Sequence, residues 1–193
     1  MDKSQVLDKI RNITVNRSGE RRAPHKPLLL LLSIARLLQG QRNIPFTDVE
    51  KSLGPLLNAY APPVQGRHQP ELPYWHLQTD QLWEVSSADD LPRQTGGFPR
   101  IPALRETSGH LEGSFAESLL ADRTLVQQAI HLLLEEHFPE SLHEDIVAAI
   151  GLGLPEADRI MEQQAGYVIT RRRDPKFREK VLRAYEYRCA ASG

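Results

Sequence analysis

The sequence of 193 residues predicts a mainly α-helical chain with one small β-hairpin. Three observations favour this fold class. Apolar residues recur at helical spacing in several separate segments, two short aromatic segments flank a polar turn, and glycine and proline cluster between these elements. The length accommodates one domain of about 150 residues and a shorter appendage.

The first half of the chain predicts three helices. Ser4 to Ile10 forms a short one, and the apolar stretch Pro24 to Leu38 forms a longer helix that is buried on most sides. Its two prolines suit a first helical turn, whose N–H groups have no partner within the helix. A third helix runs from Thr47 to Ala59, where T-D-V-E forms a capping box and Gly54-Pro55 interrupts the helix.

A β-hairpin is predicted next, after an irregular loop over 61–73 that holds four prolines. Its strands are the aromatic segments Tyr74–Leu77 and Leu82–Val85, which the polar residues Thr79-Asp80-Gln81 connect. Helices followed by a hairpin are typical of a winged-helix-like DNA-binding domain, although many small domains share this order.

The second half predicts a long loop and three more helices. The loop covers Ser87–Gly113 and contains Arg93, Arg100 and Arg105; its length favours a binding role. Helices follow over Ser118–Phe138, over Ser141–Gly151 behind the capping box S-L-H-E, and over Pro175–Tyr187. We therefore predict a domain over 1–165 and a linker with a further helix over 166–193.

Charge is distributed unevenly along the chain. The net charge is −1, yet residues 1–27 carry +4, residues 106–162 carry −10 and residues 163–193 carry +5. Phosphate binding depends on the local patch, because salt screens charges beyond about 8–10 Å. Two basic ends therefore keep nucleic acid open as a partner, and simple solvation of these ends is the alternative.

Composition and motifs exclude several classes of protein. A lone cysteine, Cys189, permits no intrachain disulfide and fits a cytoplasmic protein. No apolar run is long enough for a membrane span, and no export signal is visible. No phosphate-binding glycine loop, H-E-x-x-H or G-x-S-x-G motif occurs. His137 and His143 lie near several acidic residues, but a solvent-facing helix surface explains them better than a metal site.

Two segments are candidates for nucleic-acid contact. The string E-R-R-A-P-H-K-P places Arg21, Arg22, His25 and Lys26 before and inside the first turn of the predicted buried helix. Free N–H groups and positive potential at a helix N-terminus make this a phosphate clamp, and a basic loop covering the helix end is the alternative.

The second candidate segment is Q-G-R-H-Q-P-E-L-P-Y-W-H-L. Here prolines stiffen the chain at the predicted strand entrance, and aromatic residues follow Arg67 and His68. Aromatic side chains beside cations are frequent at nucleic-acid surfaces. They are equally frequent in cores, and Trp75 and Trp83 are most simply core residues.

Three strings carry a resemblance to a known family: R-A-P-H-K-P-L-L-L-L, P-Y-W-H-L-Q-T-D-Q-L-W-E-V and H-F-P-E-S-L-H-E-D-I. They resemble the sulfur-binding domain of phosphorothioate-dependent restriction endonucleases, which act in bacterial defence. The resemblance implies a bacterial, cytoplasmic protein whose partner is double-stranded DNA with sulfur in place of a non-bridging phosphate oxygen. No membrane partner is implied, and a homodimer is left open.

The resemblance also implies a shallow apolar sulfur pocket, formed by Leu72, Pro73, Tyr74 and His76. Family members often carry Tyr where Leu72 stands and a small residue where His76 stands. Sulfur accepts hydrogen bonds poorly, so an apolar concavity gains contact with it at little desolvation cost. The same concavity strips water from an oxygen at about 1–3 kcal/mol. Expected DNA contacts around the pocket are Arg21, Arg22, His25, Lys26, Arg67, His68, Arg100 and Arg105.

The final stretch, R-R-R-D-P-K-F-R-E-K-V-L-R-A-Y-E-Y-R-C, resembles the lead-in helix of the HNH nuclease that follows the sulfur-binding domain in this family. No catalytic histidine follows it here, so the expectation is a chain truncated at the start of that nuclease, which binds DNA and does not cut it. A divalent metal and a structural zinc would belong to the nuclease, and no cofactor is expected on this chain.

Two other functions remain open from the sequence. One is a general winged-helix DNA-binding regulator with no preference for sulfur. The other is a protein-interaction module that uses the acidic segment 106–162.

Overall fold

The computed structural model describes residues 1–15, 17–18 and 21–152. Met1–Gly153 forms one compact unit. In chain order its elements are α1 (Lys3–Arg11), β1 (Arg17–Ser18), β2 (Arg21–Arg22), α2 (His25–Leu38), β3 (Ile44–Pro45), α3 (Phe46–Tyr60), α4 (Glu71–His76), the 3-10 turn η1 (Leu77–Asp80), β4 (Trp83–Val85), η2 (Ala88–Asp90), α5 (Ile101–Leu104), β5 (Ser108–Leu111), α6 (Gly113–Ala121), α7 (Arg123–His137), η3 (Glu140–Leu142) and α8 (His143–Ala149).

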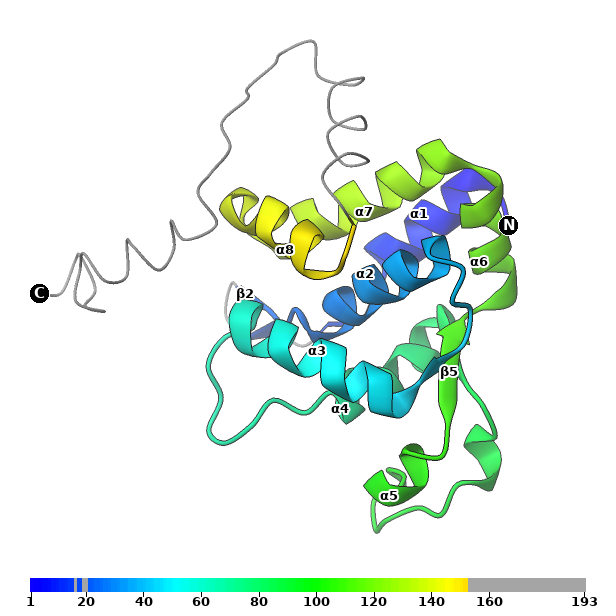
Figure 1. Ribbon diagram of the computed structural model, residues 1–193, viewed down its shortest axis with the longest axis vertical. Helices are drawn as coiled ribbons and strands as arrows, with labels where there is room; N and C mark the ends of the chain where they lie inside the picture. The colour runs from blue at the N-terminus through cyan, green and yellow to red at the C-terminus, as the bar shows by residue number, and fades with distance from the viewer. Residues whose placement is uncertain (16, 19–20, 153–193) are drawn as a thin grey trace, which may run out of the picture. The chain divides into compact units, whose positions relative to one another are not determined.

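Helix α2 forms the centre of the core. Leu28 to Leu31 are fully buried because neighbouring helices cover nearly every face of α2. Helices α1 and α7 pack together on one side of it, and α3 and α4 lie on the other (Figure 1). The strongly apolar stretch predicted to be buried on most sides is thus confirmed as the central helix.

The sheet is small and antiparallel, with the strand order β3-β5-β4. Gly109 lies in its middle strand, and an added Cβ there would clash with the Trp83 indole. Absence of a side chain at Gly109 therefore leaves room for the Trp83 indole, which is 1% exposed. A separate two-stranded ribbon, β1-β2, leads into α2.

The predicted hairpin is wrong. Residues 74–77 are helical, in α4 and η1, and β4 pairs with β5 instead. Pro70 and Pro73 explain the difference, because proline supports the first turn of a helix and has no N–H for a strand ladder. The structure confirms a mainly α-helical chain with a small sheet, while the winged-helix interpretation loses the hairpin on which it depended.

Several helix boundaries also differ from the prediction. Neither predicted capping box forms: Pro45 and Leu142 occupy the N-cap positions of α3 and α8. Helix α3 starts early because the Phe46 N–H donates to Thr107 O, 3.0 Å away, which ties the helix start to the sheet.

Helix α3 also continues through Pro55 without interruption. The single helix predicted over 118–138 is divided into α6 and α7, because Asp122 is extended there and caps α7. The helix predicted over 175–187 lies outside the described residues. Within the described part of the chain, no helix is both long and apolar enough to cross a membrane.

Candidate nucleic-acid interface

The outer face of α4 carries an exposed leucine beside an exposed histidine. Leu72 is 39% exposed, although it is a large apolar residue. His76 follows one helical turn later and is also exposed, so both side chains lie on the same face. This pair, Leu72 and His76, is called the α4 face below.

A short loop closes one side of the α4 face. Its residues 93–99 fold back on themselves, with the Gln94 N–H donating to Phe98 O at 2.7 Å. The Phe98 ring centroid lies 5.9 Å from that of His76 and 6.4 Å from that of Trp75. The Arg93 guanidinium lies 5.3 Å from the Trp75 ring centroid and also donates to Gly97 O. The loop is therefore held against α4 by aromatic and cation–π contacts.

The first turn of α2 also lies close to the α4 face. Lys26 Nζ lies 2.6 Å from Asp80 Oδ2, and both side chains are largely buried, at 13% and 4% exposed. Asp80 also accepts the Thr14 N–H, so it joins η1 to α2 and to the segment that follows α1. Burial, and secondly the charge of Lys26, lower the pKa of His76. Lys26 is thus close enough to influence the α4 face, although its own charge is compensated.

Two histidines meet next to this ion pair. The rings of His25 and His68 lie 5.6 Å apart between centroids. Burial, and secondly the proximity of His68, lower the pKa of His25. His68 is 9% exposed, and its Nδ1 has no hydrogen-bond partner among the described residues. At neutral pH His25 is therefore an uncharged hydrogen-bonding group next to Lys26.

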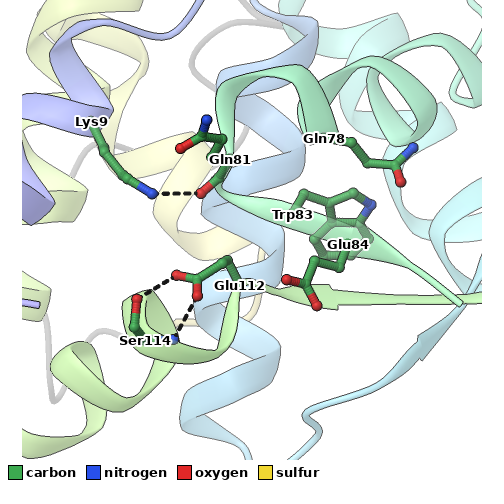
Figure 2. Close-up of a pocket in the computed structure, with 7 residues that line it drawn as sticks. All are labelled: Lys9, Gln78, Gln81, Trp83, Glu84, Glu112 and Ser114. Carbon is green, nitrogen blue, oxygen red and sulfur yellow. Dashed lines mark hydrogen bonds between the residues drawn. The ribbon is translucent and has the colours of Figure 1, made fainter.

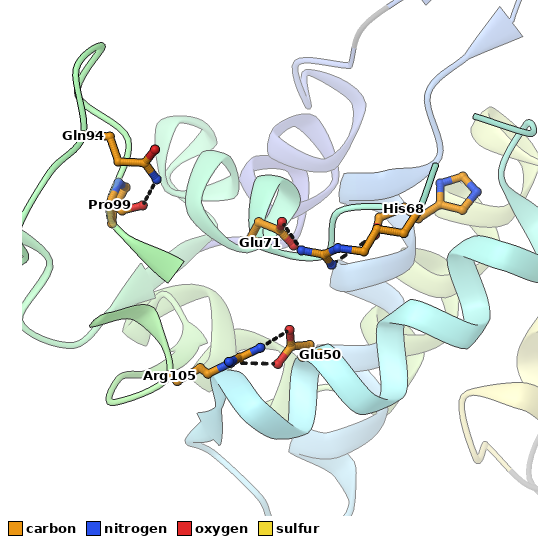
Figure 3. A network of polar contacts seen from close by, with 7 residues as sticks. Glu50, His68, Glu71, Gln94, Pro99 and Arg105 are labelled. Atoms are coloured by element: carbon orange, nitrogen blue, oxygen red, sulfur yellow. Dashed lines mark hydrogen bonds and ion pairs between the residues drawn. The ribbon is translucent and has the colours of Figure 1, made fainter. Parts of the chain in front are cut away.

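Two arginine–glutamate pairs lie at the start of α4 and on α3. Arg67 Nη2 donates to Glu71 Oε1 at 2.9 Å, and Arg105 contacts both carboxylate oxygens of Glu50, at 3.1 and 3.3 Å. Figure 3 shows the contact between Arg105 and Glu50, with Glu71 on α4 separate from it. The hydrogen bond to Glu50 raises the pKa of Arg105, which stays charged throughout the physiological range.

Comparison with known proteins identifies the family. A family model described as "ScoMcrA-like, DNA sulfur-binding domain" matches residues 3–154. This chain belongs to that family. No curated protein matches it.

Solved structures share the fold. The "Sulfur binding domain of ScoMcrA complexed with phosphorothioated DNA" matches with a TM-score of 0.67 and 23% identity, over 76% of this chain and 94% of the solved one. The corresponding SprMcrA complex gives 0.64 and 20%, over 79% and 95%. The "Type IV phosphorothioation-dependent restriction endonuclease ScoMcrA" gives 0.67 and 22%, and the match spans 92% of this chain but 38% of the endonuclease.

Two of the residues expected to form the sulfur pocket do not reach the surface of this family member. Tyr74 is fully buried against Phe46 and Trp83, and its hydroxyl lies 2.9 Å from Thr107 Oγ1. Burial raises the pKa of Tyr74 to about 12. Pro73 is buried as well. Because the segment is a helix and not a strand, Leu72 and His76 face outwards while Pro73 and Tyr74 face the core.

The basic residues expected to contact DNA occupy three situations. Lys26, Arg67 and Arg105 are ion-paired within the domain, and His25 and His68 pack on each other. Arg100 is exposed, forms no ion pair within the described part of the chain, and borders a shallow cavity of about 550 Å³ with Gln94 and Thr95. The backbone places Arg21 and Arg22 on β2, three residues before α2 begins.

Sequence reasoning missed the aromatic side of the interface. Phe98 was not singled out, Trp75 was assigned to the core, and Arg93 was noted only as one arginine of a long loop. Gly96 and Gly97, which take positive φ values of 101° and 84°, were the available signal for a tight turn here. Nothing in the residue pattern connects that turn to α4.

A second cavity, of about 460 Å³, lies between the end of α1 and the sheet (Figure 2). Its polar side chains are engaged in the fold. Lys9 Nζ donates to Gln81 O at 2.9 Å, Glu84 contacts His110, and Glu112 accepts from the Ser114 N–H and hydroxyl to cap α6. The polar groups that line this cavity therefore connect structural elements to one another.

Among the residues described, no group of three or more His, Cys, Asp or Glu is arranged to hold a metal.

Proposed function

We propose that this domain binds double-stranded DNA that carries a phosphorothioate linkage and places the sulfur on the α4 face. The observation that carries the proposal is an exposed leucine on a short helix, surrounded by cations and aromatic rings, in a member of a DNA sulfur-binding family. Two similar structures are described as sulfur-binding domains complexed with phosphorothioated DNA.

The chemistry of the α4 face favours sulfur over oxygen. An aliphatic side chain offers dispersion contact to a large, polarisable atom and no hydrogen bond to a charged oxygen. His76 adds an imidazole whose pKa is lowered, so it is mainly uncharged at neutral pH and does not attract an ordinary phosphate strongly. Leu72 and His76 therefore remain the sulfur contacts, and Pro73 and Tyr74 support the helix from the core.

Contacts to the rest of the DNA are assigned to the flanking basic residues. Arg67 and Arg100 are exposed and have N–H groups left for phosphate or base. Arg21 and Arg22 lie on the ribbon that leads into α2, whose first turn carries His25 and Lys26. The His68 ring packs against His25 and supports it. Arg105, which is paired with Glu50, contributes positive charge.

In the parent protein, we propose that this domain directs an HNH endonuclease to modified DNA. The domain would comprise residues 1–165, and residues 166–193 would lead into the nuclease. The activity that we assign to the domain itself is binding, and cleavage would be carried out by the nuclease. Metal ions would belong to the nuclease.

One binding experiment tests the proposal. Two duplexes of identical sequence, with and without a single phosphorothioate, are titrated with the domain in a fluorescence polarisation assay at stated salt, because DNA affinity depends strongly on ionic strength. We expect clearly tighter binding to the sulfur-containing duplex. Equal affinities would indicate a general DNA-binding protein, and no binding to either would favour a protein-interaction module.

A further inference from the structure

We propose that Glu71 is a positioning residue that holds Arg67 at the rim of the α4 face. This inference rests on the proposed function. Glu71 is the first residue of α4 and immediately precedes Leu72. Its side chain is 4% exposed, whereas that of its partner Arg67 is 58% exposed. A buried carboxylate therefore anchors one end of the Arg67 guanidinium, whose Nη1 also lies 3.5 Å from His68 O, while most of the side chain stays open to solvent.

The anchor matters because Arg67 lies in an irregular stretch. It follows Gly66, which has a φ of 92°, and no helix or strand contains it. A free arginine side chain loses about 2 kcal/mol of rotamer entropy when it is ordered on a ligand. A hydrogen bond of 2.9 Å to Glu71 removes much of this freedom before DNA arrives. The guanidinium keeps further donors for a phosphate or a base.

Glu71 is poorly explained as a stabiliser of the fold. Its Oε2 is buried and has no hydrogen-bond partner among the described residues. Buried ion pairs in general add little net stability, because desolvation of both charges offsets their attraction. An apolar side chain of similar length would fill the same space without that penalty. The carboxylate at this position is therefore best explained by what it does to Arg67.

Electrostatics and positioning predict opposite signs for the variant Glu71→Gln. The substitution removes a negative charge close to the DNA, so charge alone predicts tighter binding to any duplex. Weaker positioning predicts weaker binding, because the Gln amide oxygen accepts only a neutral hydrogen bond, which holds the Arg67 guanidinium less firmly than the carboxylate does. The sign of the change in affinity therefore separates the two roles.

The test compares Glu71→Gln, Arg67→Ala and the double variant on the sulfur-containing and plain duplexes. We expect about a tenfold loss of affinity for the modified duplex in Glu71→Gln. In the Arg67→Ala background the same substitution should cause no further loss, because Glu71 acts through Arg67. Glu71→Met, which fills the same space without a charge or a strong hydrogen-bond acceptor, should show at least that loss with an unchanged melting temperature.

Glu117→Gln is the matched control, since Glu117 on α6 pairs with Arg42 and both side chains are exposed. It should leave binding within about twofold of the wild type. Unchanged or tighter binding of Glu71→Gln would overturn the inference, as would an equal loss in the Arg67→Ala background. Absence of a sulfur preference in the wild-type domain would instead overturn the proposed function.

Discussion

The face around α4 and the surface of α7 and α8 differ sharply in chemistry. Residues 1–152 carry 15 Lys and Arg and 19 Asp and Glu, and nine of these acids lie within 106–152 beside a single arginine. Glu135, Glu136, Glu144 and Asp145 are exposed on or next to α7 and α8. Around α4, by contrast, most acids are buried and paired with cations.

This difference explains how a net acidic domain can bind DNA. A uniform basic surface would attract every duplex, whereas here the attraction is confined to one face and weakened by buried carboxylates. A phosphate that approaches α7 or α8 is repelled. We therefore expect a modest salt dependence and a larger share of the binding free energy from the contact at Leu72.

The largest effect is expected from a charge placed on the α4 face. Leu72→Asp removes the apolar contact and adds a carboxylate facing the DNA, which should weaken binding to the modified duplex by about 2–3 kcal/mol. The preference for sulfur should disappear in the same polarisation assay. Leu120→Asp is the matched control, because Leu120 is 42% exposed on α6. Equal losses in both variants would contradict the distinction between the two surfaces.

A smaller effect on DNA affinity is expected from the basic residues that flank the α4 face. Arg100→Ala should weaken binding to the modified and plain duplexes alike, by about 1–2 kcal/mol, and reduce the slope of log affinity against log salt by about one. Arg21→Ala and Arg22→Ala should act in the same direction. Arg42→Ala, which removes a cation from the Glu117 pair, provides the comparison. A change in the sulfur preference without a change in the salt slope would assign Arg100 to the sulfur itself.

Proton linkage gives a still smaller and reversible effect. The pKa values of His25 and His76 are lowered in the free domain from the usual 6.5, so the folded state binds fewer protons than the unfolded chain near that pH. Their contribution to folding stability is therefore present above pH 6.5 and is lost as the pH falls through the folded-state pKa values. DNA phosphates favour the protonated imidazoles, so affinity should rise as the pH falls below 6.5.

Titration of binding between pH 7.5 and pH 5.5, about one unit on either side of the ordinary histidine pKa, measures this linkage. Replacement of both His25 and His76 by Gln should flatten the pH profile. Replacement of His131, which is 55% exposed on α7 beside Glu135, should not. A profile that stays steep without His25 and His76 would transfer the linkage to another group.

The sequence predicts the α2 core well and the interface less well, for physical reasons. Helix α2 is defined by local spacing and prolines, which act within a few residues. The segment 70–77 contains β-forming aromatics, yet tertiary burial of Tyr74 and the prolines at Pro70 and Pro73 make it helical. In a strand, residues 72, 74 and 76 would share one face, whereas in a helix residues 72 and 76 share a face that excludes residue 74. Tyr74 therefore lies in the core and not in the expected pocket.

Long-range partners were equally out of reach of local patterns. Asp80 and Glu71 read as ordinary surface acids in the sequence, and only the fold shows that they are buried against Lys26 and Arg67. Phe98 is brought to His76 by a loop whose turn residues were visible but whose destination was not. Basic residues near α4 could be predicted from the sequence, whereas the groups that orient them could not.

The smallest effect on DNA binding is expected from a substitution on the core side of α4, which tests whether this side takes part in recognition. Tyr74→Phe removes one hydrogen bond, in which the Tyr74 hydroxyl donates to Thr107 Oγ1 while Thr107 itself donates to Leu104 O. The variant should lower the free energy of unfolding by about 1 kcal/mol, because Thr107 keeps its second partner and the ring still fills its site. Chemical denaturation measures this change. Sulfur preference should stay at the wild-type value, since Tyr74 is fully buried and Leu72 is unaltered. Loss of sulfur preference with intact folding would place the tyrosine hydroxyl in the recognition step and return Tyr74 to the pocket.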